Sequence, residues 1–310
     1  MALYEVPAPA KLNLFLHVTG RRADGYHELQ TVFRFIDLCD VLDFDLRRDG
    51  RIEREGQALP GLNPEDDLVV RAARALQQAT GTASGAQIRY TKRIPSGAGL
   101  GGGSSDAATT LIALNRLWNT GLDRDALIRL ARPLGADVPV FLFGCNAFAE
   151  GIGDVFTEVA LAERTYLVLQ PHGAVATADA FSSPDLTRDT ERVIMPVFAD
   201  WQTGQAEQIV SDPSDGNSLF GNPLFGRNDL QPVVLAKYQP IQQMALALQK
   251  IGFHARMTGS GSCFFIEFDT HQQAFRAQQK ISSKILESPR AVVKEHWVCP
   301  GLNEHPLRHW

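Results

Sequence analysis

The sequence predicts an α+β protein, in which strands and helices are mixed without strict alternation along the chain. Residues 4–18 alternate between apolar and polar positions, which is the period of a half-buried strand. Residues 66–79 and 104–118 place apolar side chains at the spacing of an amphipathic helix. The last third of the chain adds two helical segments on either side of a short strand. Such a mixture favours an α+β fold.

The first third of the chain predicts strands and one helix. The apolar side of the first strand carries Leu12, Leu14, Leu16 and Val18, and its opposite side carries Lys11, Asn13 and His17. Residues 29–46 are expected to form strands or a hairpin. The helix over 66–79 ends at the Thr80-Gly81 break.

The middle of the chain is expected to contain two helices among short strands. A strand over 87–90 leads through Pro95 and a glycine cluster into the helix over 104–118, which Ser and Asp open. The expected elements that follow are a helix over 123–134 and strand-like segments over 141–150 and 165–170, around a glycine turn at Gly151 and Gly153.

Beyond about residue 160 the composition shifts toward loop-forming residues. Two stretches rich in Pro, Ser, Asp and Thr, 182–192 and 211–231, are expected to be long surface loops. Further on, the expected elements are a helix over 240–251, a Gly-Ser-Gly-Ser run at 259–262, a strand over 263–268 and a helix over 272–281. A βαβ-type unit with an antiparallel partner can be built from this last set.

The composition is that of a folded globular protein. The chain has 310 residues, of which 44% are hydrophobic and 21% charged, enough for one large domain or two moderate ones. The 30 Lys and Arg residues against 35 Asp and Glu residues give a net charge of -5. We therefore expect neither a nucleic-acid polymer nor a membrane as a partner, and local geometry must hold any anionic ligand.

The cysteines and the N-terminus are typical of a cytoplasmic protein. The four cysteines, Cys39, Cys145, Cys263 and Cys299, include no Cys-x-x-Cys pair, so neither a zinc site nor a disulfide framework is expected. We interpret them as reduced, mostly buried thiols. The first residues lack a basic region followed by an apolar core, and no later apolar run is long enough to cross a bilayer.

The stretch from Pro95 to Asp106 carries the most chemical information. Five glycines lie between residues 97 and 103, directly before the helix over 104–118. Backbone N–H groups of such a loop converge on an anion at the positive end of the helix, and a triphosphate is the natural guest. A flexible linker is the alternative, but a linker is not expected to stop at a capped, strongly apolar helix.

Two common nucleotide motifs fit this stretch poorly. Gly97, Gly99 and Gly102 match Gly-x-Gly-x-x-Gly, but the βαβ setting of a dinucleotide fold is weak here. No P-loop string occurs, and its phosphate-binding lysine is missing with it. Another cation must take that place.

The same stretch resembles the central phosphate-binding motif of the galactokinase, homoserine kinase, mevalonate kinase and phosphomevalonate kinase (GHMP) superfamily. Further segments resemble the 4-diphosphocytidyl-2-C-methyl-D-erythritol kinase family within it: Pro9 to Leu16 with Gly20 to His27, Leu134 to Phe141, Thr258 to Cys263, and the terminal Gly301-Leu-Asn. The resemblance implies a two-domain GHMP kinase fold, over 1–160 (ATP-binding) and 161–310, with the active site in the cleft between domains. It also implies ATP-dependent phosphorylation of the 2-hydroxyl of the cytidine-containing substrate, in the non-mevalonate route to isoprenoids.

The resemblance implies that Lys11 and Asp137 form the catalytic pair. Asp137 accepts the proton of the attacking hydroxyl, and Lys11 stabilises charge, which suits phosphoryl transfer. In isolation, the favoured interpretation of Lys11 is a solvated side chain and that of Asp137 is a helix cap. The apolar Val-Pro-Val-Phe that follows Asp137 nevertheless requires its carboxylate to be paired or functional.

The resemblance also assigns the binding residues. The ATP-binding set is Pro95, Gly97, Gly99, Leu100, Gly101, Gly102, Gly103, Ser104, Ser105 and Asp67, and the substrate-binding set is Asn13, Tyr26, His27, Phe33, Phe181, Gly259, Ser260 and Gly261. Tyr26 and Phe181 would sandwich the cytosine while His27 hydrogen-bonds its polar edge. The run from Gly259 would close over the site, although a tight turn explains it equally well.

Further expectations concern the cofactor and the rival functions. The charge of ATP leads us to expect Mg²⁺, but no carboxylate cluster predicts a protein-built metal site, so phosphates and water would hold the ion. Asp67 stands where the family often has Asn, and Asn228-Asp-Leu-Gln231 replaces Asn-Asp-Leu-Glu. A kinase for another small alcohol and a catalytically silent nucleotide sensor are the alternatives. A monomer or a homodimer is expected.

Overall fold

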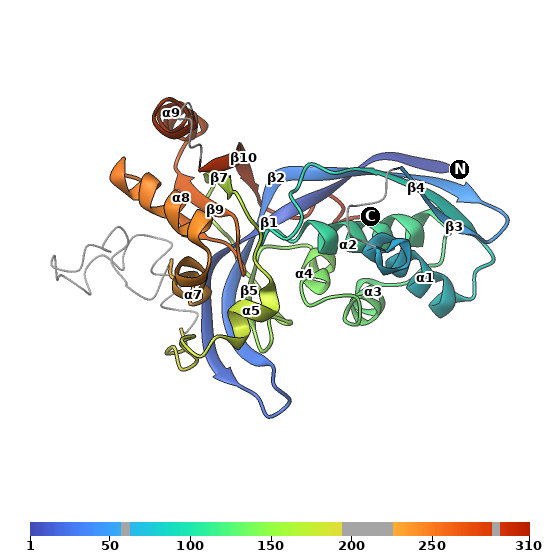
Figure 1. Cartoon of the computed structure of the whole chain (residues 1–310). Coiled ribbons are helices and arrows are strands. Elements are labelled where there is room, and N and C mark those ends of the chain that lie inside the picture. The colour runs from blue at the N-terminus through green and yellow to red at the C-terminus, as the bar shows by residue number, and fades with distance from the viewer. Residues whose placement is uncertain (57–62, 194–225, 287–291) are drawn as a thin grey trace.

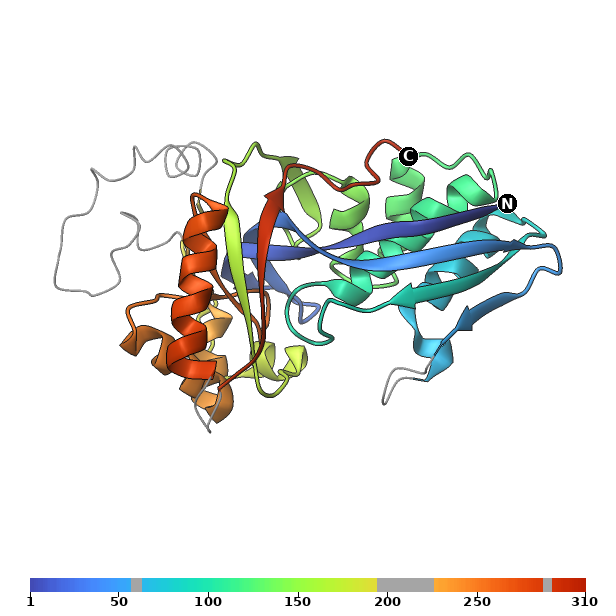
Figure 2. The same cartoon turned by 90° about the horizontal axis from the view of Figure 1, so that it is seen from above.

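The structure is a computed structural model that describes residues 1–56, 63–193, 226–286 and 292–310. Its strands join in one 10-stranded sheet within this described part. The strand order is β3 (Ile52–Glu55), β4 (Gly85–Thr91), β2 (His27–Arg47), β10 (Val293–Leu302), β7 (Thr165–Pro171), β9 (Phe264–Phe268) and β8 (Arg256–Met257), with β1 (Ala2–Arg21), β5 (Ala147–Glu150) and β6 (Val155–Glu158) paired at its side. Helices pack on this sheet at both ends of the molecule (Figures 1 and 2). The α+β class predicted from the sequence is confirmed.

A long antiparallel hairpin forms the centre of the molecule. β1 (Ala2–Arg21) pairs with β2 (His27–Arg47) along nearly its whole length. The strand predicted over 4–18 is confirmed, but its middle, residues 8–17, is buried on both faces. The stretch 29–46 is one strand of this hairpin. The remaining strands of this half are β3 (Ile52–Glu55), β4 (Gly85–Thr91), β5 (Ala147–Glu150) and β6 (Val155–Glu158).

Four helices cover one side of the strands in the first half (Figures 1 and 2). They are α1 (Leu68–Thr80), α2 (Gly102–Leu117), α3 (Arg124–Ala131) and α4 (Val138–Phe143), with a 3-10 turn, η1 (Pro64–Asp66), before α1. Their apolar faces and the inner face of the hairpin form one core. The helices predicted over 66–79 and 123–134 are confirmed, and Asp67 and Asp123 cap them with their carboxylates.

Two sequence predictions in this half are wrong. Helix α2 begins at Gly102, and Gly101 at its N-cap makes no side-chain capping bond, so Ser and Asp at 104–106 lie inside the helix instead of opening it. A strand was expected over 141–150, but residues 138–143 form the helix α4. Within the expected segment, only β5 is a strand. A short apolar run does not distinguish a buried strand from a buried helix, and Pro139 in the first turn favours the helix.

The second half is built on a split βαβ unit. β7 (Thr165–Pro171) lies between β9 (Phe264–Phe268) and β10 (Val293–Leu302) and is antiparallel to both. Helix α9 (His271–Ile281) and the π-turn η3 (Ser282–Leu286) follow β9, so the predicted βαβ unit with an antiparallel partner is confirmed. The other elements are α5 (Thr177–Ser182), α7 (Leu230–Lys237), α8 (Gln239–Lys250) and β8 (Arg256–Met257).

The two predicted loops have different outcomes. Residues 183–192 contain no helix or strand, as expected, but Leu186 and Thr190 are buried, so this loop is not wholly at the surface. Most of the loop predicted over 211–231 lies outside the described residues, and α7 begins within its last two positions.

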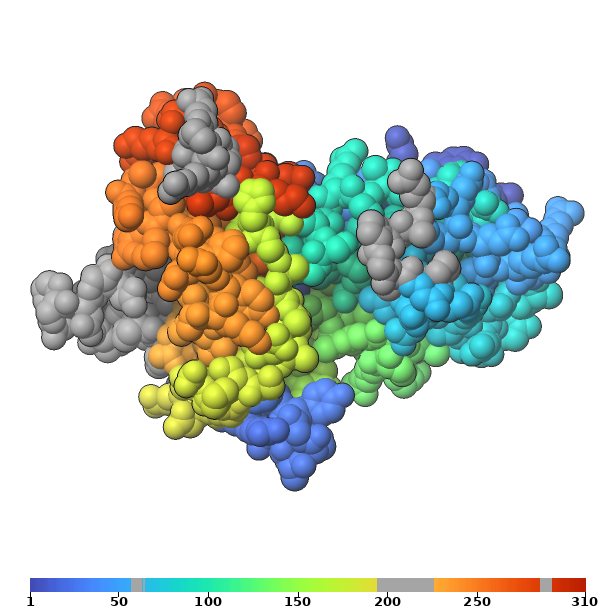
Figure 3. Space-filling model, in the orientation of Figure 1, coloured from blue at the N-terminus to red at the C-terminus, as the bar shows by residue number. Residues whose placement is uncertain are grey.

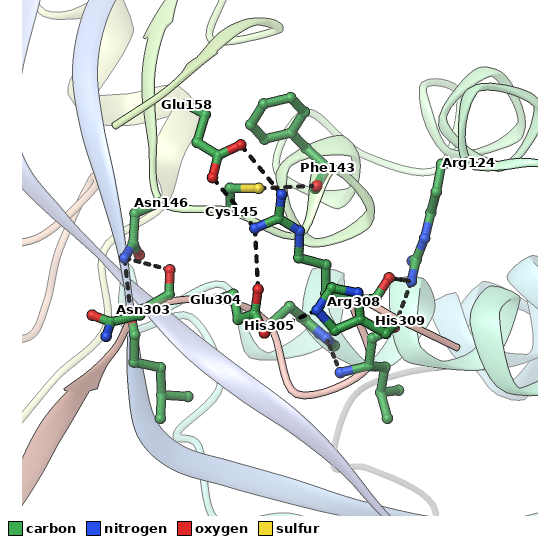
Figure 4. Close-up of polar contacts among 12 residues, drawn as sticks. Arg124, Phe143, Cys145, Asn146, Glu158, Asn303, Glu304, His305, Arg308 and His309 are labelled. Atoms are coloured by element: carbon green, nitrogen blue, oxygen red, sulfur yellow. Dashed lines mark hydrogen bonds and ion pairs between the residues drawn. The ribbon is translucent and has the colours of Figure 1, made fainter. Parts of the chain in front are cut away.

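The C-terminal tail returns to the first half of the chain (Figure 4). Asn146 donates to the backbone carbonyls of Leu302 and Asn303 at 2.9 and 3.0 Å. Arg308 pairs with Glu158 and with Glu304. The predicted domain division at residue 160 stays a prediction, and these last residues pack against the half that precedes it.

All four cysteines lie in the described residues and are free, with Cys39 half-buried and the others buried. Among the described residues, no helix is both long and apolar enough to span a membrane.

Candidate active site

A cavity of about 520 Å³ opens where the two halves of the molecule meet. β1, the glycine loop before α2, the start of α4, α5 and the loop before β9 all contribute to its wall. The predicted site residues that line it are Lys11, Asn13, Phe33, Asp67, Pro95, Gly97, Gly99, Gly101, Gly102, Gly103, Ser104, Asp137, Phe181, Gly259, Ser260 and Gly261. Residues that the sequence places up to 250 positions apart thus share one wall.

Two glycines of the loop before α2 pack closely against their neighbours and leave little room for a side chain. Gly99 has a φ of +77°, and a Cβ there would lie 2.1 Å from the carbonyl oxygen of Thr258. Gly101 has a φ of +73°, and a Cβ there would lie 3.1 Å from the Lys11 side chain. The loop is therefore fixed in a conformation that only glycine adopts readily, with its backbone open to the cavity.

The second glycine loop, residues 259–262, is tied to the first one. The Thr258 hydroxyl accepts a hydrogen bond from the Asn13 backbone N–H at 2.9 Å and donates to the Gly99 carbonyl at 3.3 Å. The Asn228 amide donates to the carbonyls of Met257 and Gly259 at 2.9 and 2.8 Å. This loop is therefore part of the cavity wall and more than a turn between strands.

Lys11 and Asp137 meet in the wall of the cavity. Lys11 Nζ lies 3.2 Å from Asp137 Oδ2 and donates to Asn13 Oδ1 at 2.6 Å. The Lys11 side chain is only 3% exposed, whereas that of Asp137 is 38% exposed. Asp137 occupies the N-cap of α4 but makes no capping bond, which leaves its carboxylate for Lys11 and for a ligand. A simple capping role does not describe Asp137.

Four sequence assignments do not reach this wall. Leu100 and Ser105 are fully buried and contribute no side chain to the cavity. Tyr26 is 61% exposed at the tip of the hairpin. His27 lies just outside the lining, with its ring centroid 5.2 Å from that of Phe181.

Strict alternation predicted that His17 would share a face with Lys11 and Asn13. This prediction is wrong. The pairing of β1 with β2 shifts register between Asn13 and Leu16, so Leu16 lines the cavity instead. His17 is fully buried, and its ring packs against Phe15 at 4.6 Å.

Asp67 has three hydrogen-bonding or ionic partners of its own. Its Oδ1 accepts from the Val69 backbone N–H at 2.9 Å, and its Oδ2 accepts from the Tyr90 hydroxyl at 2.8 Å. Arg54 Nε lies 3.2 Å from the same Oδ2. The carboxylate of Asp67 therefore forms an ion pair with Arg54 that an Asn at this position would not provide.

Sequence reasoning missed a charged cluster beneath the glycine loop. Lys92 lies between Asp40 and Asp106, with 2.5 Å from its Nζ to Asp106 Oδ2. Asp40 also accepts the backbone N–H groups of Arg93 and Ile94. Burial raises the pKa of Asp106 to about 8 despite Lys92, and Asp40 adds to the effect. The missing P-loop lysine was the signal to search for such a cation, and Lys92 lines the cavity.

The arrangement is suited to phosphoryl transfer. A backbone-lined loop at a helix N-terminus binds polyphosphate, and a carboxylate oriented by lysine accepts a proton from an acceptor hydroxyl. The fold and the site together define a small-molecule kinase of the GHMP type. Residues 67–145 match the family of GHMP kinase N-terminal domains, and residues 216–286 match that of GHMP kinase C-terminal domains.

Similar proteins define the family more narrowly. A 4-diphosphocytidyl-2-C-methyl-D-erythritol kinase of Bordetella parapertussis is 54% identical, covering 100% of this chain and 99% of its own. The corresponding kinase of Ralstonia nicotianae is 48% identical over 98% and 96% of the two chains. A crystal structure of 4-(cytidine 5'-diphospho)-2C-methyl-D-erythritol kinase superposes with a TM-score of 0.74 at 31% identity, over 97% and 99% of the chains. The chain belongs to the 4-diphosphocytidyl-2-C-methyl-D-erythritol kinase family.

The wider fold is shared with other GHMP kinases. A homoserine kinase of Cytophaga hutchinsonii superposes with a TM-score of 0.67 at 15% identity, over 98% of this chain and 95% of its own. The predicted GHMP kinase fold is confirmed.

Proposed function

We propose that this chain transfers the γ-phosphoryl group of ATP to the 2-hydroxyl of 4-diphosphocytidyl-2-C-methyl-D-erythritol, in the non-mevalonate route to isoprenoids. The observation that carries the proposal is the Lys11–Asp137 pair, 3.2 Å apart in the wall of a cavity that the glycine loop also lines. Family membership supplies the substrate. The paired carboxylate disfavours a catalytically silent nucleotide sensor.

The proposed reaction assigns each group one task. The glycine loop and the N-terminus of α2 bind the polyphosphate through backbone N–H groups. Asp137 accepts the proton of the 2-hydroxyl as that oxygen bonds to the γ-phosphorus and the bond from phosphorus to the ADP oxygen breaks. Asn13 and Asp137 hold Lys11 in place. Lys11 stabilises the negative charge that develops on the attacking oxygen and the phosphoryl group.

Mg²⁺ would arrive with the nucleotide. The described residues contain no group of three or more His, Cys, Asp or Glu side chains that could hold a metal ion. The cavity does offer a hard oxygen ligand, the Ser104 hydroxyl, which suits an ion that the phosphates and water mainly hold. When bound, the ion would neutralise phosphate charge.

The remaining proposals follow the sequence. A net charge of -5 supports a protein without nucleic-acid or membrane partners. We propose a cytoplasmic monomer or homodimer.

A coupled assay of ADP release tests the function. Purified protein with Mg-ATP is offered 4-diphosphocytidyl-2-C-methyl-D-erythritol, homoserine or mevalonate at equal concentration. We expect turnover of the first compound only. Turnover of another alcohol without the first, or of none, would reject the assignment.

A further inference from the structure

Arg188 is held in place beside the substrate end of the cavity. Its Nη1 donates to the Leu186 carbonyl at 3.0 Å, and its Nη2 donates to the carbonyls of Phe181 and Ser183 at 3.2 and 2.6 Å. Its Nε donates to His27 Nε2 at 3.2 Å. Four acceptors therefore fix one guanidinium between the loop after α5 and the start of β2.

The contact with Arg188 determines which nitrogen of His27 carries the proton. A guanidinium has donors only, so Nε2 of His27 must act as the acceptor, and the proton of the neutral ring resides on Nδ1. Burial first, and then the charges of Arg188 and Arg21, lower the pKa of His27, which favours the neutral ring. His27 is thus a fixed donor through Nδ1–H, for which the described part of the chain provides no hydrogen-bond partner.

His27 lies where it can reach a ligand in the cavity. Its ring is 5.2 Å from the ring of Phe181, centroid to centroid, with 33° between the planes. Phe181 lines the cavity. The tip of the β1–β2 hairpin, in blue, and the loop after α5, in yellow, lie side by side at this end of the molecule (Figures 1 and 3). A base stacked on Phe181 would therefore lie next to the His27 ring.

Resting on the proposed function, we propose that Arg188 makes the chain select cytosine over uracil, because it fixes His27 as a hydrogen-bond donor toward N3 of the base. N3 of cytosine is an acceptor and pairs with this N–H. N3 of uracil carries its own hydrogen, so two donors would oppose each other and both would lose their partner. Arg188 is a positioning residue in this scheme, since it acts on the base only through His27.

The tautomer is observable without any turnover. Nitrogen-15 NMR of the full-length protein, with the His27 signals assigned by comparison with His27→Gln, distinguishes a ring protonated on Nδ1 from one protonated on Nε2. At neutral pH we expect Nδ1–H in the wild type. Arg188→Met should mix the two forms and raise the pKa of His27, because a cation and a donor are removed. A wild-type ring protonated on Nε2 would overturn the proposal.

Selectivity is measured as the ratio of kcat/KM for the cytidine substrate to that for its uridine analogue. We expect about 10²-fold or more for the wild type, and a ratio at least about tenfold smaller for Arg188→Met. Arg188→Lys, which can still donate to Nε2, should recover part of the selectivity. Arg192→Met is the matched control, because Arg192 belongs to the same loop but pairs with Glu28 at the surface, and its ratio should stay at the wild-type value.

The outcomes separate this inference from the proposed function. If the wild type phosphorylates neither compound, the proposed function fails. If it phosphorylates the cytidine compound and Arg188→Met keeps the full selectivity, the function stands and the role of Arg188 is rejected. An equal loss of kcat/KM for both substrates in Arg188→Met, with the ratio unchanged, would also reject it.

Discussion

Asp106 is predicted to make the stability of the protein depend on pH. The carboxyl is 3% exposed, and one of its oxygens, Oδ1, is buried without a hydrogen-bond partner in the described structure. Burial raises its pKa from 3.8 to about 8, against the opposing effect of Lys92. The perturbation is Asp106→Asn, which keeps the shape and an oxygen for Lys92 but removes the titrating proton.

The direction follows from proton binding in the two states. The unfolded chain releases the Asp106 proton near pH 4, about its ordinary value, whereas the folded protein keeps it up to about pH 8. The folded state binds more protons in this window, so the free energy of unfolding falls as the pH rises from about 4 to about 8. About four pH units at about 1.4 kcal/mol each give a ceiling of roughly 6 kcal/mol.

Urea unfolding at pH 5, 6, 7 and 8 measures this effect. We expect Asp106→Asn to be more stable than the wild type by only about 1–2 kcal/mol at pH 5, and the difference to grow to a few kcal/mol at pH 8. Asp125→Asn, at an exposed position of α3, is the control and should stay within about 0.5 kcal/mol of the wild type throughout. Equal pH slopes for Asp106→Asn and the wild type would refute the reasoning.

Two further variants test the cavity wall. Gly99→Ala places a Cβ 2.1 Å from the Thr258 carbonyl, whereas Gly97→Ala, also at positive φ, meets nothing within 4 Å. Calorimetry should show Gly99→Ala to be less stable than Gly97→Ala by about 2 kcal/mol or more. Equal melting temperatures of the two variants would contradict the close packing. Asp67→Ala removes the partner of Tyr90 and of a buried arginine as well as a helix cap, so denaturation should show a loss of about 3 kcal/mol. Asp123→Ala, an exposed cap, should lose about 1 kcal/mol, and the idea fails if the two losses are the same.

Local chemistry explains what the sequence predicted correctly. The alternation in 4–18, the helix with its Asp67 cap, and the glycine loop that leads into α2 are all encoded by neighbours within a few positions. The errors occur where tertiary structure decides. The apolar run in α4 has no distinguishing period, and the register shift after Asn13 is not visible in the pattern of side chains.

Contacts in the site join residues that lie far apart in the sequence, and sequence patterns do not predict such contacts. Lys11 and Asp137 were paired from a family resemblance, because spacing along the chain does not indicate a contact across 126 positions. The contacts of Lys92 with Asp40 and Asp106 span 52 and 14 positions and were missed, although the search for a cation was justified. The link from Arg188 to His27 spans 161 positions and depends on a loop that no periodicity predicts.

The central claim is that Asp137 aims and deprotonates an acceptor hydroxyl at a nucleotide held by the glycine loop. The most direct test is kcat of Asp137→Asn at saturating Mg-ATP and substrate, with nucleotide affinity measured by calorimetry on the same protein. We predict nucleotide affinity within a few-fold of the wild type and a kcat lower by about 10²–10⁴-fold, as expected for the loss of a positioned general base. A kcat near that of the wild type would contradict the account.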